Sequence, residues 1–245
     1  MNKKFVMSYS GGKDSTLALY RMIKDGYIPK YIMTTINEED EHSWFHGISK
    51  ELFDEVSKCL DIPRIAINTT HYTYRVNFIE ELKKVKEEGI YICAFGDIDI
   101  QMHRDWAENL CKESGFESKF PLWHQSRISL AREFVNAGFK AKIKIIDTYK
   151  LDKKYLGLDF TNELIDEFIS IGIDPAGESG EFHTFVYDGP IFKKLLISNC
   201  QKYMILKIIQ VLILFVNTIY YNCFPLYIYF LFNYSILFYF YLLFI

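Results

Sequence analysis

The sequence has few cysteines, and they are not paired in any recognisable way. Cys59, Cys93, Cys111, Cys200 and Cys223 are widely spaced, and no C-x-x-C motif occurs among them. Structural zinc sites and disulfide-stabilised small domains both need closely grouped cysteines. We therefore expect neither, and we expect reduced thiols in a cytoplasmic protein.

The chain also lacks a large excess of charge of either sign. Its 245 residues include 28 Lys and Arg against 31 Asp and Glu, a net charge of -3. This balance argues against a strongly basic nucleic-acid-binding protein, so no direct nucleic-acid partner is expected. A secretory signal is not expected either, because the apolar run Phe5-Val6-Met7 ends at Ser8 and is too short.

Residues 195–245 lack Asp, Glu and Gly altogether and contain only two lysines, Lys202 and Lys207. Residues 226–245 carry no charge, and 20 such residues are enough for a helix to cross a bilayer of ~30 Å. Two interpretations fit this composition, whereas extra core strands are disfavoured because the tail lacks turns and alternation. Residues 203–245 are either a membrane tether for a cytoplasmic domain or a non-native C-terminus produced by a frameshift. In both cases the chemistry lies upstream.

What the sequence does have is a regular alternation of strand and helix patterns. Short apolar strands are predicted at residues 5–7, 31–36, 64–67 and 90–95. Apolar residues recur at helical spacing between them and after the last, over residues 15–26, 48–60, 76–88 and 102–111. Such alternation predicts an α/β fold, with a parallel sheet covered by helices on both faces.

The pattern changes near residue 115. Helices are predicted at 129–137 and 162–171, and strands at 142–146 and 182–187, which indicates a smaller α+β region. We therefore predict a first domain over residues 1–115, a second over 116–194 and a hydrophobic tail over 195–245.

The strongest motif is Ser10-Gly11-Gly12-Lys13-Asp14-Ser15, between the first strand and the first helix. Two glycines allow backbone N–H groups to approach a ligand, and the positive end of a helix favours an anion there. Lys13 adds a mobile cation. The simpler interpretation is an ordinary strand–helix turn, but the complete string favours phosphate binding. It is not a Walker A loop, because its glycine and lysine spacing differs.

The second motif is the segment 177–190, with the sequence GESGEFHTFVYDGP. It groups Glu178, Glu181, His183 and Thr184 around two glycines. Carboxylates and imidazoles can transfer protons, whereas the simpler interpretation is a hairpin with solvated Glu side chains. The density of such residues favours a functional site.

The first motif resembles the PP-loop of ATP pyrophosphatases, which cleave ATP between the α- and β-phosphates. Together with the second motif, the chain resembles the diphthine–ammonia ligase family, whose second domain carries a similar Gly-Glu-x-Gly-Glu-Phe/Tyr-His-Thr signature. Ser43-Trp44-Phe45-His46, Phe95-Gly96-Asp97-Ile98 and Pro121-Leu122-Trp123 follow the family pattern in the same order. The resemblance spans about residues 4–194.

This resemblance implies a Rossmann-like fold of the nucleotide α-hydrolase type with a smaller α+β domain. It also implies an ATP-dependent ligase that amidates diphthine on elongation factor 2 with ammonium. The carboxylate would be adenylated, ammonia would displace AMP, and Mg²⁺ would neutralise the polyphosphate. Alternatives are another PP-loop amidation or tRNA-modifying enzyme, or an ATP-binding sensor without turnover.

The resemblance also implies roles for individual residues. The residues expected to bind ATP are Ser10, Gly11, Gly12, Lys13, Asp14, Ser15, Gly96 and Asp97. Asp14 would orient the loop or contact Mg²⁺, and Asp97 is either a ligand-binding residue or a helix cap. The catalytic candidates are Glu178, Glu181 and His183, and the substrate-binding candidates are Gly180, Thr184, His103 and Arg104.

Overall fold

The computed structural model describes residues 3–39, 41–44, 46–194 and 196. The described residues belong to one compact unit, Met1–Ile197. The tail predicted as a membrane tether or frameshift product, residues 195–245, lies outside the described residues apart from Leu196. Within the described part of the chain, no helix has the length and apolar character needed to cross a membrane.

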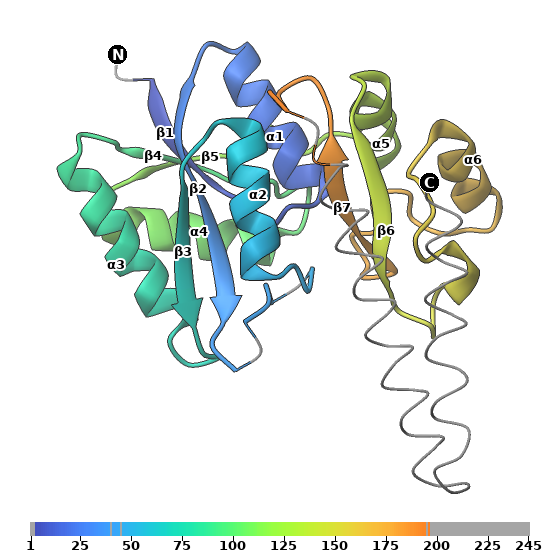
Figure 1. Cartoon of the computed structure of the whole chain (residues 1–245), viewed down its shortest axis with the longest axis horizontal. Helices are drawn as coiled ribbons and strands as arrows, with labels where there is room; N and C mark the ends of the chain where they lie inside the picture. Colours follow the sequence, from blue (N-terminus) through green and yellow to red (C-terminus); the bar gives the residue numbers. More distant parts are fainter. Residues whose placement is uncertain (1–2, 40, 45, 195, 197–245) are drawn as a thin grey trace, which may run out of the picture. The chain divides into compact units, whose positions relative to one another are not determined.

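The first half is a five-stranded parallel sheet in the order β3-β2-β1-β4-β5 (Figure 1). Its strands are β1 (Lys4–Ser8), β2 (Ile28–Asn37), β3 (Arg64–Thr69), β4 (Ile92–Ala94) and β5 (Glu117–Lys119). The helices between them are α1 (Lys13–Lys24), α2 (Lys50–Leu60), α3 (Tyr74–Glu87) and α4 (Gln101–Ser114). The predicted Rossmann-like α/β fold is confirmed.

The core lies where the sheet meets its helices. Buried Val6 and Met33 on the sheet pack with Phe78 and Leu82 of α3 and Leu110 of α4. Each such side chain stabilises the fold by about 1.5–3 kcal/mol when removed from water. Right-handed crossovers place α1 and α2 on the opposite face, so the sheet is covered on both sides.

The second half contains α5 (Arg127–Asn136), β6 (Lys140–Ile146), a short 3₁₀ helix (Lys153–Tyr155), α6 (Asn162–Ser170) and β7 (Phe182–Asp188). Strands β6 and β7 form a two-stranded antiparallel sheet. This is the predicted smaller α+β region. The sequence pattern missed β5, because Glu117-Ser118-Lys119 is short and polar, and it missed the 3₁₀ helix.

The start of α1 also differs from the prediction. The helix begins at Lys13, with Gly12 as its N-cap, rather than near Ser15. Gly12 has extended backbone angles, and its carbonyl accepts the Thr16 N–H at 3.1 Å. Gly12 has no side chain that could accept a capping hydrogen bond at this helix start.

Candidate functional site

The PP-loop, residues 10–15, joins β1 to α1 in the centre of the sheet. Gly11 has a φ of +78°, which the missing Cβ permits. The Ser10 and Ser15 hydroxyls lie 3.1 Å apart, and the Gly12 N–H donates to Ser10 Oγ at 3.3 Å. Among the described residues, no hydrogen bond uses the amide N–H of Gly11, Asp14 or Ser15. These amides at the positive end of α1 fit the predicted anion cradle.

Both PP-loop glycines are required by close neighbours. A Cβ on Gly11 would lie 2.6 Å from Ile48 Cδ1, and a Cβ on Gly12 would lie 2.5 Å from His46 Cε1. Any larger residue would push away the segment between β2 and α2. His46 and Ile48 of that segment therefore pack directly on the loop.

Lys13 is held in place, in contrast to the mobile cation that the sequence predicted. The residue is only 4% exposed. Its Nζ donates to Asp14 Oδ2 at 2.7 Å and to the Ala176 carbonyl. An ammonium has three N–H donors, so one donor remains for a ligand. The fixed position reduces the conformational entropy that ligand binding would cost.

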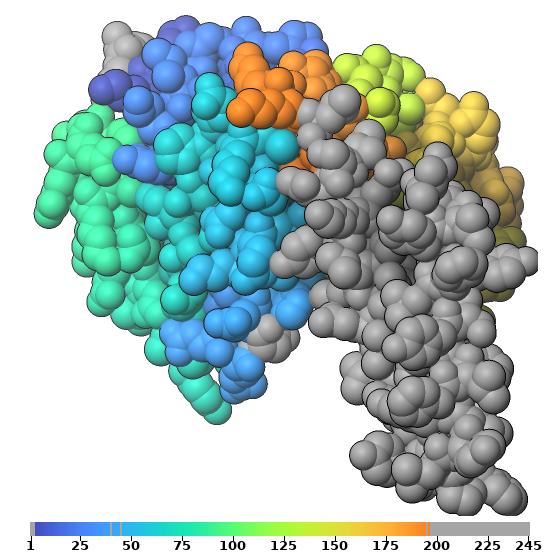
Figure 2. All heavy atoms as spheres, in the orientation of Figure 1, coloured from blue at the N-terminus to red at the C-terminus, as the bar shows by residue number. Residues whose placement is uncertain are grey.

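The second motif docks onto the PP-loop across 171 positions of sequence. The Lys13 N–H donates to Thr184 Oγ1 at 3.0 Å, and the Val186 N–H donates to the Gly11 carbonyl at 2.9 Å. Strand β7 contacts α1, and Figure 2 shows the segment that follows β7, in orange, against the blue N-terminal part. The structure therefore brings the two motifs of the sequence together at one place.

Two histidines lie beside this junction. The rings of His46 and His183 have centroids 4.7 Å apart, and His46 Nδ1 lies 2.9 Å from the Thr184 carbonyl. Burial, with the nearby His183, lowers the pKa of His46 to about 3. The neutral ring therefore donates from Nδ1 and leaves Nε2 as an acceptor. Burial and Lys13 also lower the pKa of His183.

Gly96 and Asp97 follow β4, which neighbours β1 where the strand order reverses. Ligands of open α/β sheets bind at such a switch point. A Cβ on Gly96 would lie 2.8 Å from Ser15 N, so only glycine allows this approach to the loop. Burial raises the pKa of Asp97. Asp97 is not the cap of α4, because that position is Ile100.

Glu178 and Glu181 have different environments. Burial and the nearby Asp14 raise the pKa of Glu178 to about 7. Glu181 is 8% exposed, and its buried Oε2 has no hydrogen-bond partner among the described residues. The interpretation of both as solvated hairpin residues is therefore wrong for Glu181. A buried carboxylate oxygen in that state suits a cationic or hydrogen-bonding ligand.

Three of the predicted substrate-binding residues, Gly180, His103 and Arg104, have surroundings that differ from one another. Gly180 has a φ of +80° in the turn before β7. His103 Nδ1 lies 3.7 Å from Asp97 Oδ1, at the edge of the site. The Arg104 guanidinium stacks on Phe120 and Trp123, with 5.0 and 4.7 Å to the ring centroids. It also pairs with Glu108 at 2.6 Å, and among the described residues no hydrogen bond or ion pair joins it to the PP-loop.

Sequence reasoning missed one polar network of the site. Arg127 donates to both oxygens of Asp99 at 2.7 Å and to Asp174 Oδ2 at 2.6 Å. Asp99 and Asp174 lie in loops, where an isolated carboxylate usually faces water. The only available signal was the turn sequence Asp174-Pro175-Ala176-Gly177, which says nothing of its distant partner.

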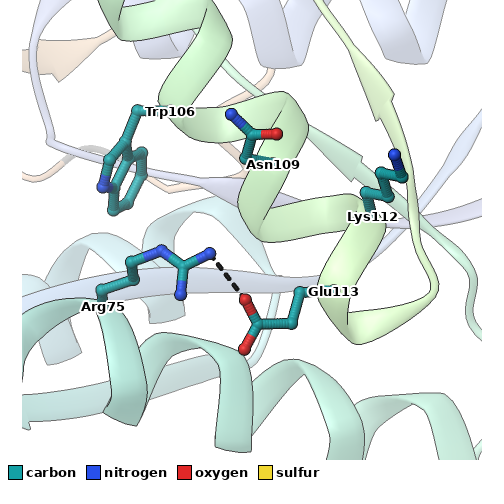
Figure 3. Close-up of a pocket in the computed structure, with 5 residues that line it drawn as sticks. All are labelled: Arg75, Trp106, Asn109, Lys112 and Glu113. Atoms are coloured by element: carbon teal, nitrogen blue, oxygen red, sulfur yellow. Dashed lines mark hydrogen bonds and ion pairs between the residues drawn. The ribbon is translucent and has the colours of Figure 1, made fainter.

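A surface hollow of about 580 Å³ lies elsewhere, between α3 and α4 (Figure 3). Arg75, Trp106, Asn109, Lys112 and Glu113 line it, and none of the predicted site residues does. The described residues contain no group of three or more His, Cys, Asp or Glu side chains arranged to hold a metal ion.

Comparisons with known proteins agree with the sequence motifs. Two family models match the chain, "Diphthamide synthase N-terminal domain" at residues 3–118 and "Diphthamide synthase C-terminal domain" at residues 126–211. The second match thus runs past residue 194, where the sequence predicts the tail to begin.

Relatives of known name share about a quarter of their residues with this chain over the matched regions. A protein of Schizosaccharomyces pombe named diphthine–ammonia ligase is 24% identical over 77% of this chain. The match covers 35% of that protein, so the chain spans about a third of its length. The mouse protein of the same name is 27% identical, over 79% of this chain and 82% of its own.

A solved structure from Methanocaldococcus jannaschii, titled as a predicted subunit of tRNA methyltransferase, is 17% identical, with a TM-score of 0.43. It covers 76% of this chain and 97% of its own. The two family models together match most of the chain, one on each side of residues 119–125. The chain belongs to the diphthamide synthase family.

Proposed function

We propose that this protein is an ATP-dependent ligase that amidates the diphthine carboxylate of elongation factor 2 with ammonia, releasing AMP and pyrophosphate. One observation carries the proposal. The Lys13 N–H of the PP-loop donates to Thr184 Oγ1 of the second motif, so a phosphate cradle and a group of acid–base residues form one site. The family membership and the named relatives support the same reaction.

The chemistry requires both halves of this site. A carboxylate attacked by ammonia has a poor leaving group, and adenylation replaces it with AMP. The amides of Gly11, Asp14 and Ser15, which have no acceptor among the described residues, are placed to bind phosphate oxygens, with Lys13 beside them. Fixed donors of this kind stabilise charge that develops during the reaction.

The residues of the site suit ATP, and they offer one carboxylate to Mg²⁺. Gly96 packs so closely on the PP-loop that a Cβ would lie 2.8 Å from Ser15 N, so no side chain at this position covers the Ser15 amide. Mg²⁺ often takes only one or two protein carboxylates and completes its shell with phosphates and water. Asp14 would supply one such carboxylate. The bound ion would neutralise polyphosphate charge.

The acid–base residues would act on the other substrates. Glu181, whose buried Oε2 has no partner among the described residues, is the best candidate to bind ammonium. Glu178 changes protonation near neutral pH, which suits proton transfer, and neutral His183 can accept a proton. We propose that Gly180, Thr184 and His103 lie at the substrate side, whereas Arg104 supports the domain link through its stacking on Trp123.

We also propose the division of the chain into an ATP-binding part and a substrate-binding part, with the boundary after β5 rather than at the predicted residue 115. The pairing of β5 with β4, and the change from one family model to the next between residues 118 and 126, support this boundary. A cytoplasmic location follows from the proposed substrate, which is a translation factor.

The direct test supplies the purified protein with ATP, ammonium and elongation factor 2 that carries diphthine. We expect AMP and pyrophosphate only when all three are present. Release of ADP and phosphate would refute the proposal.

Lys13→Ala and Glu181→Gln distinguish a ligase from an ATP-binding sensor. A ligase loses product with both changes, whereas a sensor loses nucleotide binding with Lys13→Ala alone.

A further inference from the structure

The Arg127 side chain joins three segments that meet at the site. Its guanidinium binds both oxygens of Asp99, in the loop after β4, and one oxygen of Asp174, in the loop before β7. The Asp174 side chain is only 13% exposed. Asp99 and Asp174 raise the pKa of Arg127, and the hydrogen bonds from Arg127 lower the pKa of Asp99. The Arg127 guanidinium is therefore positively charged and the Asp99 carboxylate negatively charged in this network.

The position of Arg127 is unfavourable for its own helix. It is the first residue of α5, where the helix dipole repels a positive charge. The first turn of α5 contains no acidic residue to offset it. The two carboxylates outside the helix supply that compensation, so the contacts of Arg127 point away from α5 and toward the site.

Asp174 in turn fixes the backbone that holds Lys13. Its Oδ1 accepts the Ala176 N–H at 2.9 Å, and its Oδ2 accepts the Glu178 N–H at 3.1 Å. The Ala176 carbonyl then accepts a hydrogen bond from Lys13 Nζ. A continuous series of hydrogen bonds thus runs from Arg127 through Asp174 and Ala176 to the lysine of the PP-loop.

We propose that Arg127 is a positioning residue, which sets the place of Lys13 Nζ through Asp174 and the Ala176 carbonyl. The proposal rests on the proposed function in one respect, namely that Lys13 binds the nucleotide phosphates. A planar guanidinium suits this role because it can bind two carboxylates at once in fixed geometry. Without Arg127, the turn 174–178 loses its anchor and Lys13 loses a fixed acceptor.

The test is a double-mutant cycle read by nucleotide binding. Calorimetry on the full chain with Mg²⁺ and α,β-methylene-ATP compares Arg127→Met, Lys13→Met and the double variant. We expect Arg127→Met to weaken binding of the analogue ~10-fold, which is the size of coupling found between residues of one hydrogen-bond network. In the Lys13→Met background, the same change should cause no further loss of affinity. A purely structural effect of Arg127 would reduce affinity by the same factor in both backgrounds.

Arg132→Met is the matched control. Arg132 lies on the same helix and pairs with Asp166 at 2.5 Å on the surface, so its loss should leave affinity unchanged. If Arg127→Met does not fold, Asp174→Asn enters the same cycle, since it keeps the side-chain shape and removes the charge. Equal losses in both Lys13 backgrounds, or no loss from either variant, would overturn the proposal.

Binding of the analogue needs no turnover, so the two proposals can fail separately. A wild-type chain that binds the analogue but forms no AMP with diphthine-bearing elongation factor 2 refutes the ligase function, while the cycle still judges Arg127. An additive cycle in a chain that does form AMP refutes only the role of Arg127.

Discussion

The PP-loop region and the hollow between α3 and α4 differ in how their charged residues are buried and hydrogen-bonded. The hollow has a volume of about 580 Å³ but is lined by an exposed ion pair, Arg75–Glu113, with side-chain exposures of 41% and 51%. The PP-loop region instead holds a buried lysine and long-range hydrogen bonds to β7. It also has carboxyl groups with raised pKa values. Constrained charge, rather than open volume, thus distinguishes the proposed functional site from the hollow.

The largest effect that can test this contrast is expected from Lys13→Met. Loss of a buried, fixed cation beside the proposed phosphate site should reduce AMP formation on the order of 100-fold, as for removal of one preorganised donor. The measurement is the rate of pyrophosphate release. Lys24→Met, in the last turn of the same helix, should leave the rate unchanged. Equal rates for both variants would contradict the assignment.

The next effect concerns the joint between the two motifs. Thr184→Val keeps the side-chain shape but removes the acceptor of the Lys13 N–H. A buried donor without a partner costs about 1–3 kcal/mol, so both stability and activity should fall. Urea unfolding and the ligase assay measure these losses. Thr184→Ser retains the hydroxyl and should stay near wild type; a similar loss in both variants would exclude the hydrogen bond as the cause.

A smaller effect should appear in the pH dependence of stability. Because the pKa of Glu178 is raised from 4.5 to about 7, the folded protein binds this proton more tightly than the unfolded chain does. The contribution to stability is present below pH 4.5 and is lost as pH rises through about 7. Glu178→Gln should remove this loss and flatten the curve of unfolding free energy over that window. Parallel curves for the two proteins would show that Glu178 has no such linkage.

The smallest effect is expected in the hollow. Arg75→Met breaks an exposed ion pair of 2.7 Å, and such pairs contribute about 0–1 kcal/mol. We expect unchanged AMP formation and a shift in unfolding free energy within about 0.5 kcal/mol. A large loss of activity would mean that the hollow belongs to the functional surface after all.

Much of this molecule could be predicted from local patterns. The parallel sheet follows from apolar strands that alternate with helical stripes, and the PP-loop follows from six consecutive residues. The burial of Lys13 could not be predicted, because it depends on Ala176 and Thr184 far along the chain. The Arg127 network has the same cause, since single charged residues in sequence look like surface charges. Strand β5 was missed because an edge strand of three polar residues has no apolar period.

The hydrogen bond between Lys13 and Thr184 has a consequence for folding. Closing a contact across 171 residues is slow compared with forming local turns, because much chain entropy is lost before the contact forms. During synthesis, the PP-loop leaves the ribosome long before β7 does. We therefore expect the nascent chain to complete the proposed ATP site only when the last described strand has docked, which would delay nucleotide binding until the fold is nearly complete.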